Sequence, residues 1–204
     1  MTVDAGARPP ASVRRDALGG VVGPVAFVAA WLSTGLAQDG YSPLHDPISD
    51  LAGAHASTRP VMTAGFVLFT IGLCFYARAL RATLPGYAWI TAAATGLATL
   101  GVAAFPLHHS STVDHVHGAF AGVGYVTLAA TALLSAAPLA HRGEPGWSRA
   151  ALAAGIVSAV ALALTLGGSF HGLFQRIGLT AGDLWIVASA LGIRWGTMAS
   201  SRHA

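Results

Sequence analysis

The chain has 204 residues, of which 54% are apolar and only 9% are charged, and its formal net charge is +3. This composition predicts an all-α integral membrane protein, with no room for a separate soluble domain. It also argues against nucleic acid as a partner, because no basic run is interleaved with aromatic residues.

Six apolar runs predict transmembrane helices, at residues 18–38, 60–80, 87–105, 117–140, 150–169 and 180–198. A helix needs about 20 apolar residues to cross about 30 Å of hydrocarbon, and lipid offers unpaired backbone groups no partner. We therefore expect a six-helix transmembrane bundle over residues 18–198. Residues 1–17 are expected to form a disordered cytoplasmic tail, and residues 199–204 a second cytoplasmic tail.

Arginine sets the expected orientation, since the chain contains no lysine. Most arginines fall at one set of span ends, and by the positive-inside rule both termini are cytoplasmic, with Arg59 and Arg176 as outer exceptions. The expected location is the plasma (inner) membrane, crossed several times. Alternatively, the first span is a cleaved signal peptide, because Arg14 and Arg15 precede it and residues 35–37 resemble a cleavage site.

Histidine supplies the main functional clue. Seven of the nine histidines lie near or within three polar segments that this topology places on the outer face: His45, His55, His108, His109, His115, His117 and His171. This clustering predicts that the outer face carries the functional site.

The first polar segment covers residues 38–50. Asp46 followed by Pro47 indicates the start of a short helix capped by the Asp46 carboxylate. Asp46 and Asp50 would then share one face of that helix. Because Asp50 is not needed as a cap, it is the better candidate for chemistry.

The second polar segment, residues 106–118, holds four histidines and Asp114. Imidazole and carboxylate are the usual ligands of zinc, so a zinc site is one interpretation, although no standard ligand motif is present. A second interpretation is interfacial histidines that pack and donate hydrogen bonds, and a third is pH sensing. Asp114 has a structural alternative as the cap of the fourth span, with His117 facing the bundle.

The third polar segment, residues 169–176, brings His171, Gln175 and Arg176. Arginine is depleted on this face, which predicts a partner for Arg176 such as Asp50, Asp114 or an anionic headgroup. A structural ion pair is the alternative to a binding role.

Thr180 and Asp183 fit a capping box at the start of the last predicted span. Asp183 is therefore interpreted first as structural. If it lies deeper in the membrane, it becomes a candidate functional acid.

Several short motifs resemble the bacterial six-span membrane family catalogued as domain of unknown function 998. They are Tyr41-Ser42-Pro43-Leu44, Ile48-Ser49-Asp50-Leu51-Ala52, Gly65-Phe66-Val67-Leu68, Phe105-Pro106, His117-Gly118, Gly172-Leu173-Phe174-Gln175-Arg176 and Leu184-Trp185. The resemblance covers residues 20–198 and implies a six-helix bundle without an assigned reaction. It adds interest to Ser49, Asp50, His117, Gln175 and Arg176.

A second resemblance, used only as a chemical analogy, is to membrane hydrolases related to alkaline ceramidases, which hold zinc through three histidines. Ser111 and His115 imitate one piece of that pattern. This chain has six predicted spans where that group has about seven, and it lacks their paired C-terminal histidines, leaving His171 with Gln175.

The first functional hypothesis is a metal-dependent hydrolase of a lipid or amphiphile at the outer face. Its expected zinc ligands are drawn from His108, His109, His117 and His171. Its candidate catalytic residues are Asp50, Asp114 and Ser49, with Asp50 or Asp114 as general base on the metal-bound water. Arg176 and Gln175 are expected to bind the substrate headgroup.

Two hypotheses from other classes stay open. One is a small-solute or proton-linked carrier, or a sensor or accessory protein, which needs ionisable groups deep in the membrane. The other is a metal-free acid–base isomerase or cyclase that uses Asp50 or Asp46 and a large aromatic-lined pocket. Membrane lipids are the expected partners in each case. A homodimer is also possible, since small residues such as Gly65, Gly72 and Gly122 permit close helix contacts.

Overall fold

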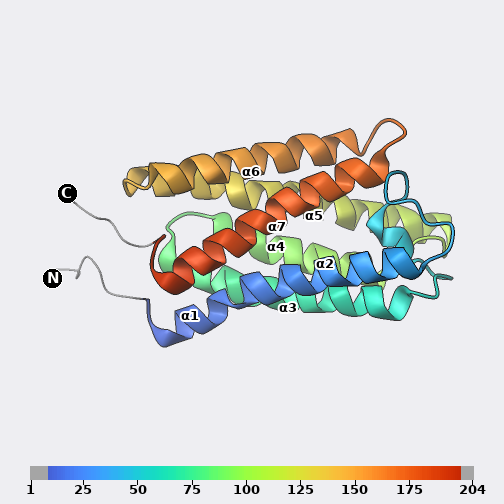
Figure 1. The fold of residues 1–204 in the computed structure, drawn as a ribbon, viewed down its shortest axis with the longest axis horizontal. Coiled ribbons are helices and arrows are strands. Elements are labelled where there is room, and N and C mark those ends of the chain that lie inside the picture. Colours follow the sequence, from blue (N-terminus) through green and yellow to red (C-terminus); the bar gives the residue numbers. More distant parts are fainter. Residues whose placement is uncertain (1–8, 199–204) are drawn as a thin grey trace.

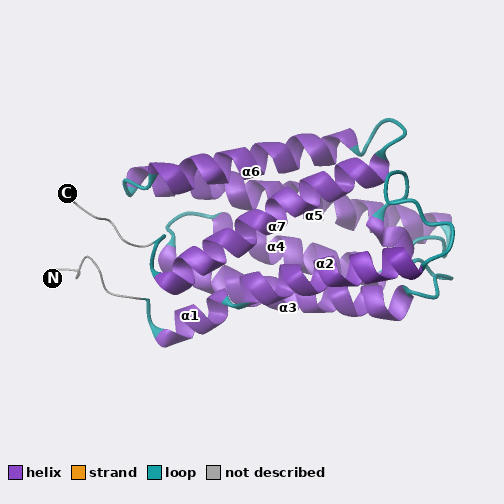
Figure 2. Ribbon diagram, viewed as in Figure 1, coloured by secondary structure: helices purple, strands orange, loops and turns teal. Residues whose placement is uncertain are grey.

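The computed structural model describes residues 9–198, which are mostly helical and contain no strand (Figures 1 and 2). The all-α prediction is confirmed. In chain order the elements are α1 (Ala11–Ala17), α2 (Gly19–Ala37), the 3-10 helix η1 (Ile48–Ala52), α3 (Arg59–Thr83), α4 (Ala88–Ala104), α5 (Ser111–His141), α6 (Pro145–Leu164) and α7 (His171–Trp195).

The long helices have the length and composition of membrane spans. Five stretches meet both criteria: Ala11–Ala37, Arg59–Thr83, Ser111–His141, Pro145–Leu164 and His171–Trp195. The remaining long helix, α4, is apolar but has only 17 residues, or about 25 Å at 1.5 Å per residue. The predicted spans correspond to α2 to α7, and the chain is a multi-pass helical membrane bundle.

Each long helix packs beside the next, and α7 packs back against α1 and α2 to close the bundle. Figure 1 shows α1 and the end of α7 at the left of the bundle and three connections gathered at the right. We call these the first outer turn (residues 38–58), the second outer turn (105–110) and the third outer turn (165–170). Their outward orientation stays a prediction from the arginines.

Glycines allow α2 and α3 to touch along their backbones. A Cβ atom on Gly72 would lie 2.5 Å from the carbonyl oxygen of Gly19 and 2.7 Å from Cα of Gly23, so no larger residue fits there. Such close contacts matter because lipid provides no hydrophobic force between helices. Gly65 also permits a close contact within the bundle, because a Cβ atom there would lie 2.5 Å from the Cβ of Ala30. A Cβ atom on Gly122 would meet nothing within 4 Å. The homodimer stays a prediction.

Four predicted span boundaries differ from the helix ends by five residues or more. The helix α5 begins at Ser111 rather than at residue 117, and α6 begins at Pro145 rather than at residue 150. The last helix, α7, begins at His171 rather than at residue 180, and α6 ends at Leu164 rather than at residue 169. The third polar segment is therefore largely the first turn and a half of a helix. An apolar-run criterion misses such a turn, because its polar side chains face the first outer turn instead of lipid.

Part of the predicted N-terminal tail is ordered. Residues 11–17 form α1, although the whole range 1–17 was expected to be disordered. Arg194 Nη1 donates to the carbonyl oxygen of Arg14 at 3.2 Å, and Arg78 pairs with Asp16 at 3.2 Å. These contacts with α7 and α3 offset the entropy lost on ordering the segment. Residues 1–8 and the predicted C-terminal tail, 199–204, lie outside the described part of the chain.

Asp183 lies in the middle of α7, so the prediction that it helps to cap this helix was wrong. Its side chain is buried, and within residues 9–198 neither carboxyl oxygen has a hydrogen-bond partner. Ser189, further along the same helix, is paired with the hydroxyl of Tyr76 at 2.7 Å. Asp183 is therefore the deep acid that the sequence left open as an alternative.

Candidate functional site

The first outer turn lies between the other two and contacts both. Towards the second outer turn, the backbone amide of Ala54 donates to the carbonyl oxygen of Leu107 at 2.8 Å. Towards the start of α7, the amide of Leu173 donates to the carbonyl oxygen of Leu44 at 3.1 Å. Polar groups from separate parts of the sequence are therefore brought to one end of the bundle.

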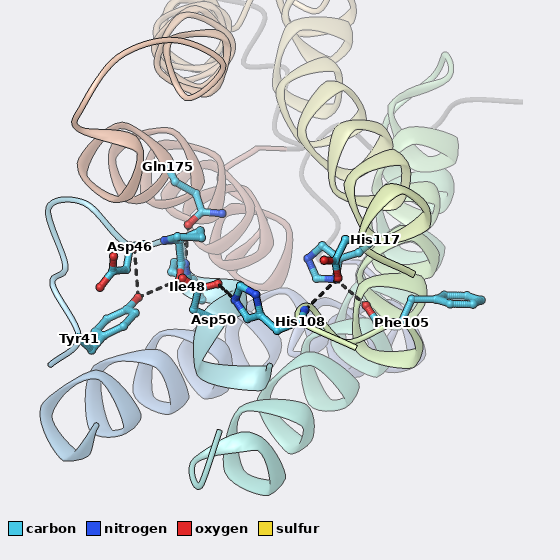
Figure 3. Close-up of polar contacts among 10 residues, drawn as sticks. Tyr41, Asp46, Ile48, Asp50, Phe105, His108, His117 and Gln175 are labelled. Atoms are coloured by element: carbon cyan, nitrogen blue, oxygen red, sulfur yellow. Dashed lines mark hydrogen bonds and ion pairs between the residues drawn. The ribbon is translucent and has the colours of Figure 1, made fainter. Parts of the chain in front are cut away.

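His108 and Asp50 form the central side-chain contact of this end. Nε2 of His108 lies 3.0 Å from Oδ1 of Asp50, as Figure 3 shows between the second outer turn and η1. A carboxylate can only accept a hydrogen bond. When Asp50 is ionised, Nε2 of His108 therefore carries a hydrogen and donates a hydrogen bond to Asp50. The other ring nitrogen, Nδ1, then holds a lone pair. The His108 side chain is 63% exposed, which leaves the ring accessible to water and headgroups.

The backbone of His108 is in the left-handed region, with φ of 63°, and it is the only non-glycine residue of the described chain with positive φ. This conformation costs about 1–2 kcal/mol for a residue with a side chain. The His108 amide donates to Oδ1 of Asp114 at 2.9 Å, which holds the turn. Strained residues of this kind cluster at functional sites, and here the strain directs the ring towards Asp50.

Asp50 is partly buried beneath this contact. Burial raises the pKa of the Asp50 carboxyl, and the hydrogen bond from His108 partly opposes that shift by favouring the charged form. The two residues are therefore coupled, because protonation of Asp50 removes the acceptor that orients the ring. This is the geometry expected of a carboxylate that orients an imidazole.

The predicted helix caps in both turns need correction. Asp46 does not cap η1, because its Oδ2 accepts from the upstream amide of Ser42 at 2.7 Å and so closes the preceding turn. Ser110 caps α5 by accepting from the amide of Val113 at 3.3 Å, while Asp114 reaches back to His108. In each case the carboxylate stabilises the loop instead of the helix end.

Arg176 clamps the first outer turn to α7. Its Nη1 donates to the carbonyl oxygens of Pro43 at 2.7 Å, Asp46 at 3.1 Å and Gly172 at 2.9 Å, and Nη2 donates to the hydroxyl of Tyr41. The guanidinium also lies over the rings of Trp31 and Tyr41, with centroid distances of 5.3 and 5.4 Å. Neither Asp50 nor Asp114 is its partner.

Gln175 secures η1 from the same helix. Its Oε1 accepts from the amide of Ile48 at 2.7 Å, and its Nε2 donates to the hydroxyl of Tyr125 at 2.5 Å. Tyr41 adds a bond from its hydroxyl to the carbonyl oxygen of Pro47 at 3.1 Å. Burial raises the pKa of Tyr41 although Arg176 opposes the shift, so the phenol remains a donor here. Both side chains therefore position the first outer turn, and the substrate-binding role of Gln175 and Arg176 stays a prediction.

A small aromatic cavity lies inside the bundle below η1. It has a volume of about 50 Å³. Ser49 and Gln175 contribute to its lining, and Ser49 is itself buried. Most of the wall is apolar and includes Phe27, Phe66, Phe69, Phe120 and Tyr125. Tyr125 also lines an open apolar groove of about 410 Å³ between α5 and α6.

The histidines predicted to bind zinc do not converge. Nδ1 of buried His117 donates to the carbonyl oxygen of Phe105 at 2.6 Å, joining α5 to the end of α4 (Figure 3). Nδ1 of His171 donates to the carbonyl oxygen of Thr165 at 2.8 Å. His109 is exposed beside His108. No group of three or more metal-ligating side chains occurs within residues 9–198, so the residues in place do not fit a zinc site.

Some residues of this end carried no sequence signal for their role. Tyr41 stood in a recognised motif but had no assigned function, and Tyr125 is a single phenol in an apolar span. The left-handed backbone of His108 follows from a three-dimensional turn that no residue pattern marks. The seven clustered histidines led us to predict a functional site at the outer turns. Only the folded structure shows that one of them, His108, pairs with Asp50.

Comparison with known proteins supports the architecture. A family model described as "Protein of unknown function (DUF998)" matches residues 21–192, which is most of the chain. The family resemblance indicated by the short motifs is thereby confirmed. None of the curated proteins and none of the solved structures matches the chain.

Proposed function

This chain belongs to the DUF998 family, and from that premise we propose that it is an acid–base enzyme acting on amphiphiles at the outer membrane face. His108 is the base, and Asp50 orients it. The observation that carries the proposal is the 3.0 Å contact between Nε2 of His108 and Oδ1 of Asp50, made by a residue in a strained backbone conformation. An oriented imidazole with one free nitrogen is the usual form of a general base.

Hydrolysis of an ester or amide is the reaction class that this pair suits. Nδ1 of His108 takes a proton from water while the water oxygen bonds to the substrate carbonyl carbon. The same proton then passes from Nδ1 to the leaving oxygen or nitrogen as its bond to that carbon breaks. Asp50 stays ionised and stabilises the imidazolium between these two steps. The substrate is a lipid or amphiphile, as in the metal-dependent hydrolase predicted from the sequence. No step of this reaction depends on a metal.

The surroundings favour an amphiphile as substrate. The pair lies at the end of a membrane bundle, where headgroups lie, and an apolar groove of about 410 Å³ runs between α5 and α6. Tyr125 separates this groove from the internal cavity and lines both. An acyl chain in the groove would keep the molecule in the membrane while its polar part reaches the outer turns.

The cavity volume bears on the isomerase or cyclase alternative. At about 50 Å³ the cavity is far smaller than the roughly 300–1,000 Å³ of ordinary ligand pockets, so it is too small to enclose a whole apolar substrate. The predicted pocket is aromatic-lined, but it is not large. A reaction at the headgroup therefore fits the geometry better than cyclisation inside the bundle.

A proton-linked carrier is the second candidate, and Asp183 is the observation that favours it. Its carboxyl is buried in the middle of α7 without a partner in the described chain. Ionisable groups at such depth commonly mark proton or ion pathways. The candidate predicts proton uptake that depends on Asp183 and not on His108.

The acid–base enzyme is tested in vesicles of phosphatidylethanolamine and phosphatidylglycerol that also contain one ester-linked and one amide-linked probe lipid. Mass spectrometry follows release of the fatty acid. We expect His108→Gln to lower the rate by about 10²-fold or more and Asp50→Asn to lower it less. His109→Gln is the matched control, because it removes an adjacent exposed imidazole. Equal rates in the His108 and His109 variants, or no release by the unmodified protein, would overturn the proposal.

A further inference from the structure

A basic groove lies at the end of the bundle opposite the outer turns. It is open, has a volume of about 620 Å³, and is formed by α1 and the end of α7. Its lining consists of Ala11, Arg14, Arg15, Arg194 and Trp195. Three arginines in a five-residue lining make it the most strongly charged of the grooves described for residues 9–198.

These arginines have no carboxylate partner among the described residues. The nearby acid, Asp16, is paired with Arg78 at 3.2 Å, beside a second groove that Arg15 also lines. Arg194 uses Nη1 to hold the carbonyl oxygen of Arg14, which fixes α1 against α7 and keeps the arginines together. Unlike Arg176, whose Nη1 donates to three backbone carbonyls, Arg14 and Arg15 donate no side-chain hydrogen bond within residues 9–198.

We propose that this groove binds the phosphate of an anionic phospholipid. The lipid comes from the leaflet that surrounds this end of the bundle. Guanidinium groups match phosphate oxygens with paired, charge-assisted hydrogen bonds. Basic pockets between spanning helices at this membrane surface are suited to anionic headgroups. The site is at the end of the bundle opposite the outer turns, so it does not depend on the proposed enzymatic function.

The lipid is a better occupant than free phosphate because of what borders the groove. Trp195 is 64% exposed, as expected for an indole at the level of the headgroups. Leu18 follows directly on α1 and Val22 lies in the first turn of α2, and both are also exposed, at 36% and 58%. A phosphate held by the arginines would leave apolar surface towards the membrane for the attached acyl chains. Free phosphate would make no use of that surface.

The test compares ligands on the detergent-purified full chain. The thermal unfolding midpoint is followed during addition of phosphatidylglycerol, phosphatidylcholine or inorganic phosphate. We expect saturable stabilisation by phosphatidylglycerol alone. Arg14→Gln and Arg15→Gln should each weaken the apparent affinity about fivefold. Arg15 is exposed, so its replacement should leave the fold intact. It also leaves the hydrogen bond from Arg194 to the carbonyl oxygen of Arg14 in place. Arg149→Gln, an exposed arginine outside the groove, is the matched control.

Each alternative outcome has a distinct meaning. Equal stabilisation by inorganic phosphate would show a general anion site and overturn the lipid assignment. Equal stabilisation by phosphatidylcholine would show that the headgroup charge is not recognised. An equal loss of affinity in the Arg15 and Arg149 variants would show a diffuse effect of surface charge, and the groove would then not be the site.

Discussion

His108 and Asp50 are 58 residues apart in the sequence, yet their side chains meet at 3.0 Å at the outer end of the bundle. Two structural features maintain this contact. Asp114 holds the left-handed backbone of His108, and Gln175 holds the amide of Ile48 at the start of η1, two residues before Asp50. The pair is thus supported from α5 on one side and from α7 on the other.

The stability of the protein should depend on the protonation of Asp50. Its pKa is raised above the ordinary value of 3.8, so the folded protein binds this proton more tightly than the unfolded chain does. The contribution of Asp50 to the free energy of unfolding is therefore largest below the ordinary pKa and falls as pH rises through the raised value. Asp50→Asn should remove this part of the pH dependence, measured by thermal unfolding in detergent across that window.

The control for this prediction is Asp39→Asn, which changes an exposed carboxyl in the same turn. It should keep the pH dependence of the unmodified protein. An identical profile for the unmodified protein and the Asp50 variant would show that Asp50 is not held in the environment described here.

Replacing Arg176 should detach the first outer turn from α7. Arg176→Gln removes the fork that donates to three carbonyl oxygens and the stacking on Trp31 and Tyr41, and should cost about 2–4 kcal/mol. Lysine cannot reproduce the planar fork, so Arg176→Lys should restore little. Hydrogen exchange over residues 41–52 is the direct measurement, because those amides should lose protection first.

Arg59→Gln provides the comparison for Arg176, since it removes the same charge from the same end of the bundle. It should change the free energy of unfolding by less than about 0.5 kcal/mol. Similar exchange in the Arg59 and Arg176 variants would contradict the clamp.

Removal of metal should leave the protein unchanged. The imidazoles of His117 and His171 donate through Nδ1 to separate backbone carbonyls, and no set of three ligands gathers in the described chain. A strong chelator should therefore not alter the unfolding midpoint. One zinc per chain that survives dialysis and disappears in His117→Ala or His171→Ala would instead restore the metal-dependent hydrolase.

Asp183 should carry a proton in the folded bundle. An isolated carboxylate in an apolar interior is far more costly than the neutral acid, and no described side chain pairs with it. Asp183→Asn, which keeps the shape without the charge, should change stability by less than about 1 kcal/mol. The infrared carbonyl band of a protonated carboxylic acid should be present in the unmodified protein and absent from the variant. A band that persists in the variant would show that it belongs to another residue.

The sequence was a good guide wherever the membrane imposes the structure. Apolar runs located the helices, because lipid leaves the backbone no alternative to helix. The same criterion placed the start of α7 too late, since it excludes the polar turn from His171 to Arg176. Asp183 was consequently assigned to a cap, although it lies mid-helix.

The site was less predictable because its contacts are long-range and many involve the backbone. Arg176 was expected to find a carboxylate or a headgroup, but its partners are carbonyl oxygens that only the folded first outer turn presents. Asp50 was correctly singled out as a carboxyl not needed for capping. Its partner could not be chosen among seven histidines until the turn at His108 was known.

The short helix α4 has a consequence for the surrounding bilayer. Its length of about 25 Å is less than the usual hydrocarbon thickness of about 30 Å, so the bilayer beside α4 must thin to keep the polar groups beyond the helix ends out of the hydrocarbon. This hydrophobic mismatch would draw headgroups inwards next to Phe105, where α4 ends and the second outer turn begins. Amphiphiles would then meet His108 at the level of the deformed leaflet, with less need to leave the membrane.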